Sequence, residues 1–576
     1  MDAGNTVNGT EDGLTWDAID WRRHERAVRR LRGRIFTAAK SGDLARARNL
    51  QKLMLRSWSN TLVAVRRVTQ VNAGRATAGI DGQVALTGEA RMSLARRVHA
   101  ADLRAWKPRP VRRVHIPKGS SGKLRPLGIP VLADRVLQAR VASALEPEWE
   151  ARFEPRSYGF RPGRSCQDAI AALFTTCRGT GAKRLWILDA DLSKAFDKIR
   201  HPFLLEQLGT FPARELIARW LKAGVFEAGK GFAPTEEGTP QGGLISPCLL
   251  NVALHGLEGA AGVRYQPNGW VKPGSPVLVR YADDFAACCH SRQQAERVRE
   301  NLEQWLEPRG LSFNEDKTRI VHLSEGFDFL GFTLRRFGPK LIIKPSKAAV
   351  SRVKRKLADE MRRLRGTNAS AVLGAVAPVV RGWASYYRGV VSKQVFSDLD
   401  SHVFVLTFKW ACWTHPKKGR RWVVGRYFGM FHPARQDHWV FGDRGSGRYL
   451  PKFAWTKIER HTLVQGTASP DDPALADYWA DRRRKRKPPL GTSTLNLLRK
   501  QDGRCPLCGD LLLLAEREPQ SPEEWELWHR VVRKAMTRSA IGQSYSERVS
   551  VLNGAPLVHA SCQRRFSGAA AEALPA

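Results

Sequence analysis

Apolar residues recur along this chain with two different spacings, and each spacing predicts a different kind of element. From Trp16 to about Leu55 they return every three or four positions, which is typical of a helix that buries one face. The same spacing runs from Ser346 to Arg365. The apolar faces are formed by Val28, Leu31, Ile35 and Ala38 in the first segment and by Val350, Val353, Leu357, Met361 and Leu364 in the second. We therefore expect helix near the start of the chain and again after its middle.

Strand patterns lie between these helical segments. Residues 112–130 contain two short apolar runs joined by Gly-Ser-Ser-Gly, which predicts a hairpin, and residues 185–188 form an apolar run of strand length. Residues 277–289 have apolar runs on both sides of a Tyr-Ala-Asp-Asp tip, which predicts a second hairpin with two carboxylates at its turn. Neighbouring side chains on a straight strand face opposite ways, so the turn is where both carboxylates can approach one site.

Carboxylates gather where these strand segments end. Asp189 and Asp191 follow the apolar run and share a face by the two-residue period, whereas Asp197 lies beyond the expected start of a helix. Asp283 and Asp284 form the tip of the second hairpin. Acids at strand ends beside such a hairpin can hold two divalent metal ions, which bridge an attacking hydroxyl and phosphates. An Asp-Asp turn by itself is more often a solvated loop, so the rest of the sequence has to distinguish the two.

The overall charge indicates a polyanionic partner. The chain has 576 residues, enough for three or four domains, and 42% of them are hydrophobic, which permits buried cores. Lys and Arg number 95 against 55 Asp and Glu, a formal net charge of +40. Such an excess favours nucleic acid, because each neutralised phosphate releases condensed counterions. An anionic membrane surface is the rival partner. However, no apolar run approaches the ~20 residues that span a bilayer, so we expect no membrane association.

The nine cysteines are scattered except for one set near the end, which does not make a disulfide framework in a chain of this size. The first residues lack a basic and then apolar targeting signal. We therefore expect the protein to be in a reducing compartment, the prokaryotic cytoplasm or nucleoid. Near the end, Cys505-Pro-Leu-Cys508 is followed about fifty residues later by His559-Ala-Ser-Cys562. Two such pairs predict a four-ligand tetrahedral zinc site with no open position, and hence a structural metal.

Arginines cluster in several segments, for each of which the alternative is a solvated face. They crowd the first predicted helix, and residues 157–165 interleave them with aromatic residues, as surfaces that clamp nucleic acid do. A cationic run over 482–487 precedes two prolines and suits a linker or a DNA-binding segment. Trp383 and Tyr387 lie four apart and fit bundle core better than base stacking. The candidate contact residues are Arg22, Arg26, Arg30, Arg161, Arg164, Arg355, Arg381, Arg388, Arg482, Arg483 and Arg484.

The order of seven sequence blocks is more specific than any one of them. Together they resemble the reverse transcriptases encoded in group II introns, and the resemblance covers about residues 15 to 565. The blocks are Ile-Pro-Lys with Arg-Pro-Leu-Gly-Ile-Pro (116–130), Tyr-Gly-Phe-Arg-Pro-Gly-Arg-Ser (158–165), Asp191 with Phe196, Pro-Gln-Gly-Gly (240–243), Tyr-Ala-Asp-Asp (281–284), Leu-Ser-Phe-Asn-Glu-Asp-Lys-Thr-Arg (311–319) and Phe-Asp-Phe-Leu-Gly-Phe (327–332).

This resemblance implies an α+β multidomain protein built as a right-hand polymerase. We expect a basic helical extension and the start of the fingers over residues 1–110, and fingers and palm with an antiparallel sheet over 111–340. A helical thumb or maturase domain would cover 341–464, and a basic linker or DNA-binding segment would cover 465–500. The last part, 501–576, would be a small zinc-knuckle module of ββα form that resembles an HNH endonuclease domain.

The resemblance also implies roles for individual residues. Asp191, rather than Asp189, matches the first catalytic aspartate, and Asp283 and Asp284 match its partners at a site for two Mg²⁺ ions. Phe196 matches the steric gate that excludes a 2′-hydroxyl, and it can pack in the core as well. The other residues expected to bind the nucleotide are Lys118, Arg125 and Gln241.

The HNH-like module departs from the pattern of its family. Trp528-His529 stands where an Asp-His or His-His pair is expected, and Cys562-Gln563 stands where Cys-His should close the motif. Trp528 cannot ligate a catalytic ion, and Gln563 is a poor substitute for imidazole. His529 remains as the one candidate general base. We therefore expect a degenerate nuclease, in which the zinc ligands Cys505, Cys508, His559 and Cys562 persist but strand cleavage is weak or absent.

The function implied is RNA-directed DNA synthesis, together with binding of the parent intron RNA to assist splicing and mobility. The expected partners are group II intron RNA, template RNA with a DNA primer, target DNA and deoxynucleoside triphosphates. Two alternatives are a splicing cofactor that no longer polymerises and a reverse transcriptase of another lineage. The polymerase residues present argue against the first, and the thumb block and knuckle module against the second. The oligomeric state stays open, with a dimer as one possibility.

Overall fold

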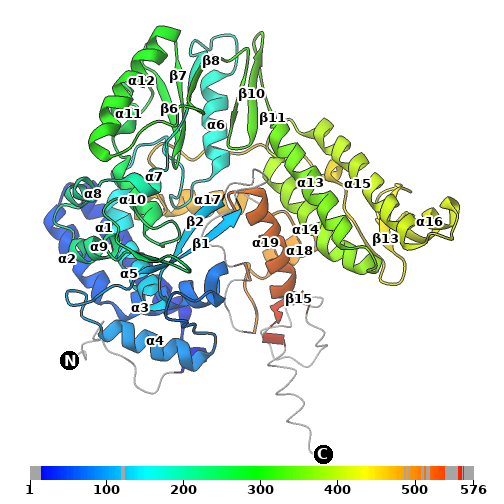
Figure 1. The fold of residues 1–576 in the computed structure, drawn as a ribbon, viewed down its shortest axis with the longest axis horizontal. Helices are drawn as coiled ribbons and strands as arrows, with labels where there is room; N and C mark the ends of the chain where they lie inside the picture. Colours follow the sequence, from blue (N-terminus) through cyan, green and yellow to red (C-terminus); the bar gives the residue numbers. More distant parts are fainter. Residues whose placement is uncertain are drawn as a thin grey trace, which may run out of the picture. The chain divides into compact units, whose positions relative to one another are not determined.

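In the computed structural model the chain forms two compact units, each of which is described by itself (Figure 1). The first comprises Met1–Glu325 with Leu463–Asp481, and the second comprises Gly326–Thr462 with Arg482–Ala576. The structure describes residues 15–117, 124–485, 488–490, 492–507, 512–513, 519–538, 556–560 and 562–563. Among the helices of these ranges, none is long and apolar enough to cross a membrane.

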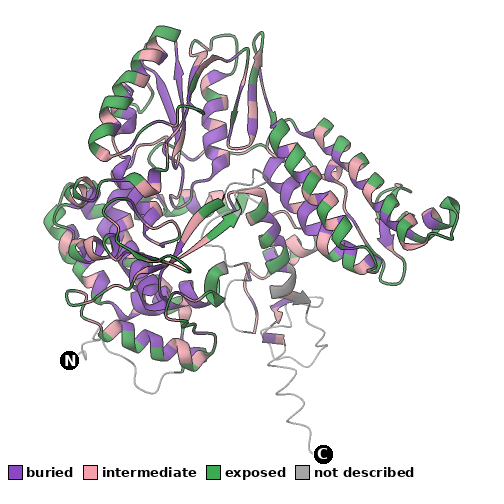
Figure 2. Ribbon diagram, in the orientation of Figure 1, coloured by how far each residue is buried: buried purple, intermediate pink, exposed green. Residues whose placement is uncertain are grey.

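The first unit contains a helical part built around one buried helix. α5 (Leu132–Glu150) is buried along almost its whole length, as the purple in Figure 2 shows. Three helices pack against it and bury their apolar faces there. They are α1 (Trp21–Lys40), α2 (Leu44–Arg56) and α3 (Trp58–Arg66). α4 (Gly88–Ala100) packs on α3 and α5.

The continuous helix predicted from Trp16 to about Leu55 is wrong in one respect, because the segment forms two main helices. Gly42 adopts a φ of +77° after α1 ends, a conformation that glycine takes at no steric cost. Asp43 then caps α2, since its side chain accepts a hydrogen bond from the backbone N–H of Arg46. The predicted apolar face survives on α1, where Val28, Leu31, Ile35 and Ala38 are all buried.

Two four-stranded sheets complete the first unit, and we call them the fingers sheet and the palm sheet. The fingers sheet has the order β2-β1-β4-β5, with strands β1 (Val111–Pro117), β2 (Leu124–Ile129), β4 (Val225–Glu227) and β5 (Gly231–Ala233). The palm sheet has the order β6-β7-β3-β8, with strands β3 (Trp186–Asp191), β6 (Val277–Tyr281), β7 (Asp284–Cys289) and β8 (Arg319–His322). Both predicted hairpins are confirmed as β1–β2 and β6–β7.

Helices pack against the palm sheet from several segments of the chain. α6 (Cys166–Cys177) contacts β6, and α12 (Arg292–Leu306) contacts β3 and β7. The apolar residues of β3, β6 and β7 are almost completely buried between them. The other helices of this part are α7 (Ala195–Lys198), α8 (His201–Leu208), α9 (Arg214–Leu221), α10 (Ser246–Ala253) and α11 (Leu257–Ala260).

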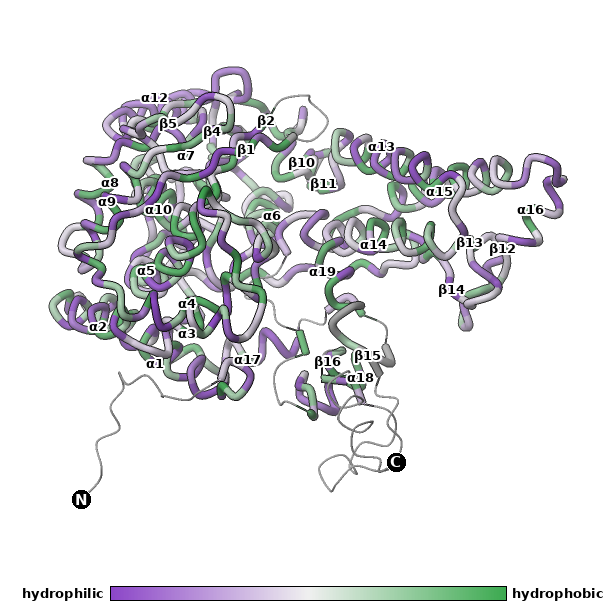
Figure 3. Tube along the Cα trace, turned by 60° about the horizontal axis from the view of Figure 1, so that its bottom comes forward, coloured by the Kyte–Doolittle hydropathy of each residue, from purple (hydrophilic) through white to green (hydrophobic). Residues whose placement is uncertain are grey.

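The second unit is mainly helical. Its three long helices are α13 (Lys347–Arg363), α14 (Ala369–Tyr387) and α15 (Lys393–Thr414), and α13 follows the predicted segment closely. Figure 3 shows α13 as mostly hydrophilic, in keeping with the basic residues that flank its narrow apolar face. Trp383 and Tyr387 are buried with ring centroids 4.3 Å apart, which confirms that they are core residues.

Within its described residues, the second unit also contains small sheets and shorter helices. The antiparallel sheet β9 (Phe327–Phe329), β10 (Phe332–Phe337) and β11 (Lys340–Pro345) precedes the long helices, so the expected division after residue 340 falls within β11 and the compact unit begins at Gly326. The remaining elements are α16 (Arg420–Tyr427), β12 (Phe428–Gly429), β13 (Val440–Asp443), β14 (Arg448–Tyr449), the end of α17 (Ala476–Lys485), α18 (Thr492–Lys500), α19 (Pro522–Ala535), β15 (Met536–Arg538) and β16 (Leu557–His559).

Residues 463–481, which we call the return segment, pack on the first unit rather than serving as part of a linker. Arg32 of α1 donates two hydrogen bonds to the buried carboxylate of Asp471, at 2.8 and 2.7 Å. Lys40 pairs with Asp472 at 2.8 Å, and the backbone N–H of Val464 donates to Asp168 at 3.0 Å. The linker expected over 465–500 therefore begins after this segment.

Candidate active site and metal centre

The β6–β7 hairpin presents two acids at a tight turn. Tyr281 and Asp284 are opposite each other in register, so Ala282 and Asp283 form a two-residue turn. Ala282 has a φ of +58°, which is unusual for a residue with a side chain and reflects the reversal in so few residues. This is the arrangement that the Tyr-Ala-Asp-Asp tip predicted.

The third acid lies directly across the palm sheet. Asp191 is the last residue of β3 and is in register with Asp284 of β7. Asp189, two residues earlier, accepts a hydrogen bond from Arg319 of β8 at 3.2 Å and is paired in that way. The strand register thus brings Asp191, rather than Asp189, opposite Asp284, which is the residue that the family resemblance implied.

Two of the acids have raised pKa values. Burial, and then the charge of Asp191, raise the pKa of Asp283. Burial, and then the charges of Asp283 and Asp191, raise the pKa of Asp284 well above the usual value. Burial and mutual repulsion disfavour the ionised form of these carboxylates. A divalent cation bound between them would favour the ionised form, so the cluster suits such a cation. Oxygen ligands of this kind are those that Mg²⁺ prefers, so the donor set fits the expected magnesium site.

Two residues from the segment after α12 hold Asp191. Its Oδ2 pairs with the ammonium group of Lys317, and the backbone N–H of Asn314 donates to the backbone oxygen of Asp191 at 2.8 Å. Partial burial lowers the pKa of Lys317, but the hydrogen bond and charge of Asp191 outweigh it and raise that pKa overall. The Asn-Glu-Asp-Lys segment therefore positions the first acid and adds a cation beside it.

A buried arginine holds the turn in place through hydrogen bonds. Arg280 is only 1% exposed, and its guanidinium donates to Asn251 at 2.9 Å, to the backbone oxygen of Ala282 at 3.1 Å and to Ser157 at 2.6 Å. Burial lowers the pKa of Arg280 to about 10, which leaves it charged at neutral pH. Sequence reasoning missed this residue, although a single arginine inside an apolar strand run was an available signal.

Gly159 brings a second segment against the same turn. A Cβ atom at this position would lie 2.2 Å from the backbone nitrogen of Ala282, so any larger residue would displace the turn. Asn251 donates to the backbone oxygen of Gly159 at 2.9 Å and also accepts from Arg280. The Tyr-Gly-Phe-Arg block is therefore structural support for the acids.

The predicted nucleotide-binding residues lie on three segments of the first unit. Arg125 is exposed on β2, and its charge lowers the pKa of Asp283. Phe196 is half-buried on α7, with its ring centroid 6.1 Å from that of Phe160. Gln241 is half-buried, and its backbone oxygen accepts a hydrogen bond of 2.6 Å from Gly128 of β2. Lys118 lies outside the described residues.

Two of the predicted nucleic-acid contacts are wrong. The side chain of Arg161 is completely buried and donates two hydrogen bonds of 3.0 Å to Glu150 of α5. Arg164 is 3% exposed and donates to the backbone oxygens of Pro155, Gly466 and Ala468. These arginines tie α5 and the return segment to the fold, so nucleic acid does not reach them.

The other predicted cations differ in exposure. Arg381, Arg388 and Arg482 are half-buried, and Arg388 pairs with Glu459 at 2.8 Å. The exposed members of the set are Arg22, Arg26, Arg30, Arg355, Arg483 and Arg484. Exposure is what contact with a phosphate backbone requires, so these six remain the better candidates.

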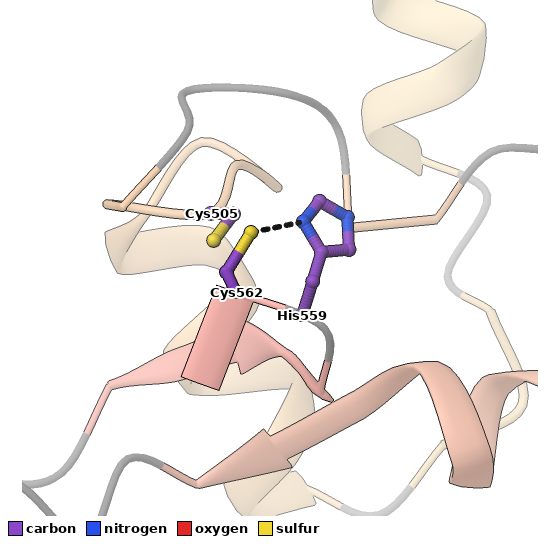
Figure 4. Close-up of side chains that lie close together, drawn as sticks. All are labelled: Cys505, His559 and Cys562. Atoms are coloured by element: carbon purple, nitrogen blue, oxygen red, sulfur yellow. Dashed lines mark hydrogen bonds between the residues drawn. The ribbon is translucent and has the colours of Figure 1, made fainter. Parts of the chain in front are cut away.

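A separate cluster of metal-ligand residues lies near the end of the chain (Figure 4). One ligand atom from each of Cys505, His559 and Cys562 lies within 4.8 Å of the others, and Nδ1 of His559 lies 3.8 Å from Sγ of Cys562. Cys505 and Cys562 are buried, which suits a structural metal. Cys508, the fourth expected ligand, lies outside the described residues.

His529 does not have the surroundings of a general base, so that prediction is wrong. It lies on α19, is 3% exposed, and its Nε2 is 3.2 Å from the hydroxyl of Ser385 on α14. Burial, and then the charges of Arg381 and Arg388, lower its pKa to about 3. The residue is a neutral packing partner between two helices, which its position in the sequence did not reveal.

Three family models match the chain. They are "Reverse transcriptase (RNA-dependent DNA polymerase)" over residues 116–334, "N-terminal domain of reverse transcriptase" over 16–98, and "Group II intron, maturase-specific domain" over 350–428. The first contains all three acids of the palm sheet, and the last contains most of α13 and all of α14 and α15.

Curated relatives agree with these models. Protein YkfC of Escherichia coli (strain K12) is 34% identical over 344 residues, which cover 54% of this chain and 88% of YkfC. Group II intron-encoded protein LtrA of Lactococcus lactis subsp. cremoris is 30% identical over 46% of this chain and 53% of LtrA, so the match spans about half of that relative. Maturase-like protein 1 of Euglena gracilis is 26% identical over 67% of this chain and 79% of its own length.

The fold, the acids and these matches define a polymerase of the reverse transcriptase class. The chain belongs to the group II intron reverse transcriptase and maturase family. Its enzymatic class is RNA-directed DNA polymerase, and its family function combines reverse transcription with a role in intron splicing.

Proposed function

We propose that Asp191, Asp283 and Asp284 form the catalytic centre for adding deoxynucleotides to a DNA primer on an RNA template. This proposal rests on the register of β3 and β7, in which Asp191 lies opposite Asp284 and beside the turn that contains Asp283. Bound there, two Mg²⁺ ions supply activation of the primer 3′-hydroxyl and stabilisation of the leaving pyrophosphate. The hydroxyl attacks the α-phosphate directly, and no covalent enzyme intermediate forms.

The chain's own residues then orient the reactants. Asn314 and Lys317 hold Asp191, while Arg280 holds the turn that carries Asp283. We assign Arg125 to binding the triphosphate, because its charge lowers the pKa of Asp283 and a guanidinium can bind phosphate oxygens in pairs. We assign Lys118 the same task, Phe196 the exclusion of a 2′-hydroxyl, and Gln241 a contact with the nucleotide.

Primer extension on RNA tests the catalytic assignment. Asp283→Asn should abolish Mg²⁺-dependent extension while the protein still binds the template and primer, because the change removes a metal ligand without altering the exposed cations. A variant that extends primers as well as the unchanged protein would show that the assigned site is wrong.

We also propose that exposed arginines on α1 and α13 bind group II intron RNA, which is the contact that splicing assistance needs. Arg22, Arg26, Arg30 and Arg355 are exposed, and helix faces of this kind neutralise phosphates. Intron splicing with purified protein separates the two activities. It should survive Asp283→Asn and fail when Arg22, Arg26 and Arg30 together become alanine; the reverse pattern would refute the assignment.

Finally, we propose that the terminal module binds one structural Zn²⁺ through Cys505, Cys508, His559 and Cys562, contacts target DNA, and does not cut it. The three described ligands cluster in a buried position, whereas His529 is unavailable for proton transfer. Metal analysis should find about one equivalent of zinc, and Cys562→Ser should lower it. Metal-dependent nicking of DNA that disappears in His529→Ala would contradict the absence of nuclease activity.

A further inference from the structure

Three residues around the acid site have a backbone conformation that residues with side chains rarely adopt. Phe160, Lys194 and Ala282 have φ values of +61°, +47° and +58°, and they are three of the five non-glycine residues with positive φ in the described part of the chain. Ala282 lies in the turn beside Asp283. Lys194 immediately precedes α7, three residues after Asp191. Such strain gathers at functional sites, and it is most unusual for a bulky residue such as Phe160.

Both neighbours of Phe160 are held in place, which fixes its conformation. Gly159 packs so closely on the turn that a Cβ atom there would lie 2.2 Å from the backbone nitrogen of Ala282. On the other side, the completely buried side chain of Arg161 donates two hydrogen bonds of 3.0 Å to Glu150 of α5. Strained backbone persists where the surrounding structure determines it in this way. The direction in which the ring of Phe160 leaves the chain is therefore set by its two neighbours.

The ring of Phe160 meets the ring of Phe196 edge to face. Their centroids are 6.1 Å apart and their planes are inclined by 70°, a geometry that aromatic pairs prefer. Among the ring pairs of the described residues, this is the one that Phe196 makes. Both rings are half-buried, since each packs on the core and keeps part of its surface open. Phe160 is thus in a position to limit the orientation of the Phe196 ring.

The backbone of Phe196 is held by a different segment. The backbone N–H of Thr239 donates to the backbone oxygen of Phe196 at 2.5 Å. The preceding residue, Gly238, has a φ of +80° and lies so close to Asp197 that a Cβ atom there would be 2.6 Å from its backbone. With its backbone fixed, Phe196 keeps only the rotation of its side chain, and the ring of Phe160 restricts that rotation.

We propose that Phe160 is a positioning residue for the ring of Phe196 and thereby sets how strongly the enzyme discriminates between deoxyribonucleotides and ribonucleotides. This inference rests on the role proposed above for Phe196, the exclusion of a 2′-hydroxyl. Steric exclusion depends on distance, and a misplacement of about 1 Å is enough to change a reaction rate. Because Gly159 packs on the turn of Asp283, Phe160 also ties the position of the Phe196 ring to that of the acids.

The ratio of kcat/KM for dATP to that for ATP, measured in Mg²⁺-dependent primer extension on one RNA template, tests this. Phe160→Ala should lower the ratio about three- to tenfold, which corresponds to the loss of one aromatic pair. Phe160→Leu, which keeps a larger apolar side chain, should lower it too, and Phe160→Tyr, which keeps the ring, should preserve it. Phe203 is a matched control, because it is half-buried and its ring contacts Arg309 instead. Phe203→Ala should leave the ratio unchanged.

A double-mutant cycle separates the ring contact from an independent effect. In the Phe196→Ala background, which should itself lower the ratio, Phe160→Ala should cause no further decrease. An unchanged ratio in Phe160→Ala, including a loss of both efficiencies in equal proportion, would overturn the proposal and make Phe160 a packing residue only. A full decrease in the Phe196→Ala background would overturn it as well.

The role proposed for Phe196 fails in a different way. If Phe196→Ala leaves the ratio unchanged, the exclusion role is wrong, and the inference about Phe160 is wrong with it. If Phe196→Ala lowers the ratio and Phe160→Ala does not, only the inference about Phe160 is wrong. The catalytic assignment is distinguished from both, because Asp283→Asn tests extension itself rather than the choice of sugar.

Discussion

Arg280 shows how one side chain can determine the geometry of the acid site without being part of it. It lies one residue before Tyr281 and joins three segments, through Ser157, Asn251 and the backbone oxygen of Ala282. A planar guanidinium can make these contacts together because its donors have a fixed geometry, which a lysine ammonium lacks. Arg280 is therefore a positioning residue for the turn.

Arg280→Lys should lower the rate of nucleotide addition by about 10- to 100-fold, the effect of losing a charged hydrogen bond. It should also raise the Mg²⁺ concentration for half-maximal activity, because the acids are no longer held together. Arg156→Lys is a matched control, since that guanidinium contacts Tyr265 rather than the turn. A normal magnesium dependence in Arg280→Lys would show that its role is structural only.

Glu258 carries a second buried charge in the same unit. Its carboxylate accepts from the backbone N–H of Arg156 at 3.0 Å and pairs with the hydroxyl of Tyr265. Burial, and then the charge of Glu154, raise its pKa to about 7. A carboxyl with a raised pKa in the folded state contributes stability below its ordinary pKa, and that contribution is lost as the pH rises through the folded value.

Glu258→Gln should therefore stabilise the first unit at pH 8.5, by on the order of 2 kcal/mol, and have little effect near pH 5. The amide keeps the shape of the side chain and removes the charge that burial disfavours. Thermal unfolding at the two pH values measures this. A stabilisation that is equal at both, or a loss of stability at pH 8.5, would contradict the assignment.

At the level of elements, α19 packs against the long helices of the second unit. A Cβ atom at Gly382 of α14 would lie 2.5 Å from the backbone nitrogen of Glu526, so the glycine permits the close approach of the two helices. Glu526 also pairs with Lys356 of α13, and His529 meets Ser385 of α14. The helix that precedes β15 is thus attached to the thumb.

Gly382→Ala should destabilise the second unit by about 1–3 kcal/mol, the usual cost of overpacking, and increase hydrogen exchange in residues 522–535. Gly374 is a control on the same helix, because a Cβ atom there would meet nothing within 4 Å. Gly374→Ala should stabilise by about 0.5–1 kcal/mol through helix propensity. Equal effects of the two changes would refute the close approach.

Local sequence patterns predicted the strands and the turn of the acid site. They could not predict the role of residues whose surroundings depend on packing between distant segments. Alternation and the turn signal were enough for the β6–β7 hairpin. The strand period put Asp189 and Asp191 on one face, and the family resemblance was needed to choose Asp191 as the partner of the hairpin. Arg161 and His529 could not be judged in the same way, because a buried partner such as Glu150 or Ser385 leaves no trace near them in the sequence. The cationic helix and its phosphate-binding role depend on exposure, which periodicity suggested correctly for Arg22, Arg26 and Arg30.

For the whole molecule, the return segment supplies acidic partners to two cations of α1. Arg32 and Lys40 of α1 are paired with Asp471 and Asp472. Arg22, Arg26 and Arg30, near the other end of α1, are exposed. The first turns of this helix therefore carry exposed arginines that can neutralise phosphates.

Changing Arg22, Arg26 and Arg30 to glutamine should weaken RNA binding and reduce the slope of log K against log salt by about 2, at ~0.7 per phosphate contact on single strands. Filter binding at several salt concentrations measures the slope. Arg292 and Arg299 of α12 are controls, because both are already paired with glutamates. An unchanged slope in the triple variant would exclude α1 from the RNA interface.

The most direct test of the catalytic centre compares two aspartates on the same strand. Asp191 and Asp189 lie on one face of β3, but only the first is in register with Asp284, while the second pairs with Arg319. In Mg²⁺-dependent primer extension on RNA, Asp191→Asn should lower the rate on the order of 10³-fold or more, as expected when a metal ligand worth several kcal/mol is lost. Asp189→Asn should retain most activity. Equal activity of the two variants, or the greater loss in Asp189→Asn, would contradict the account.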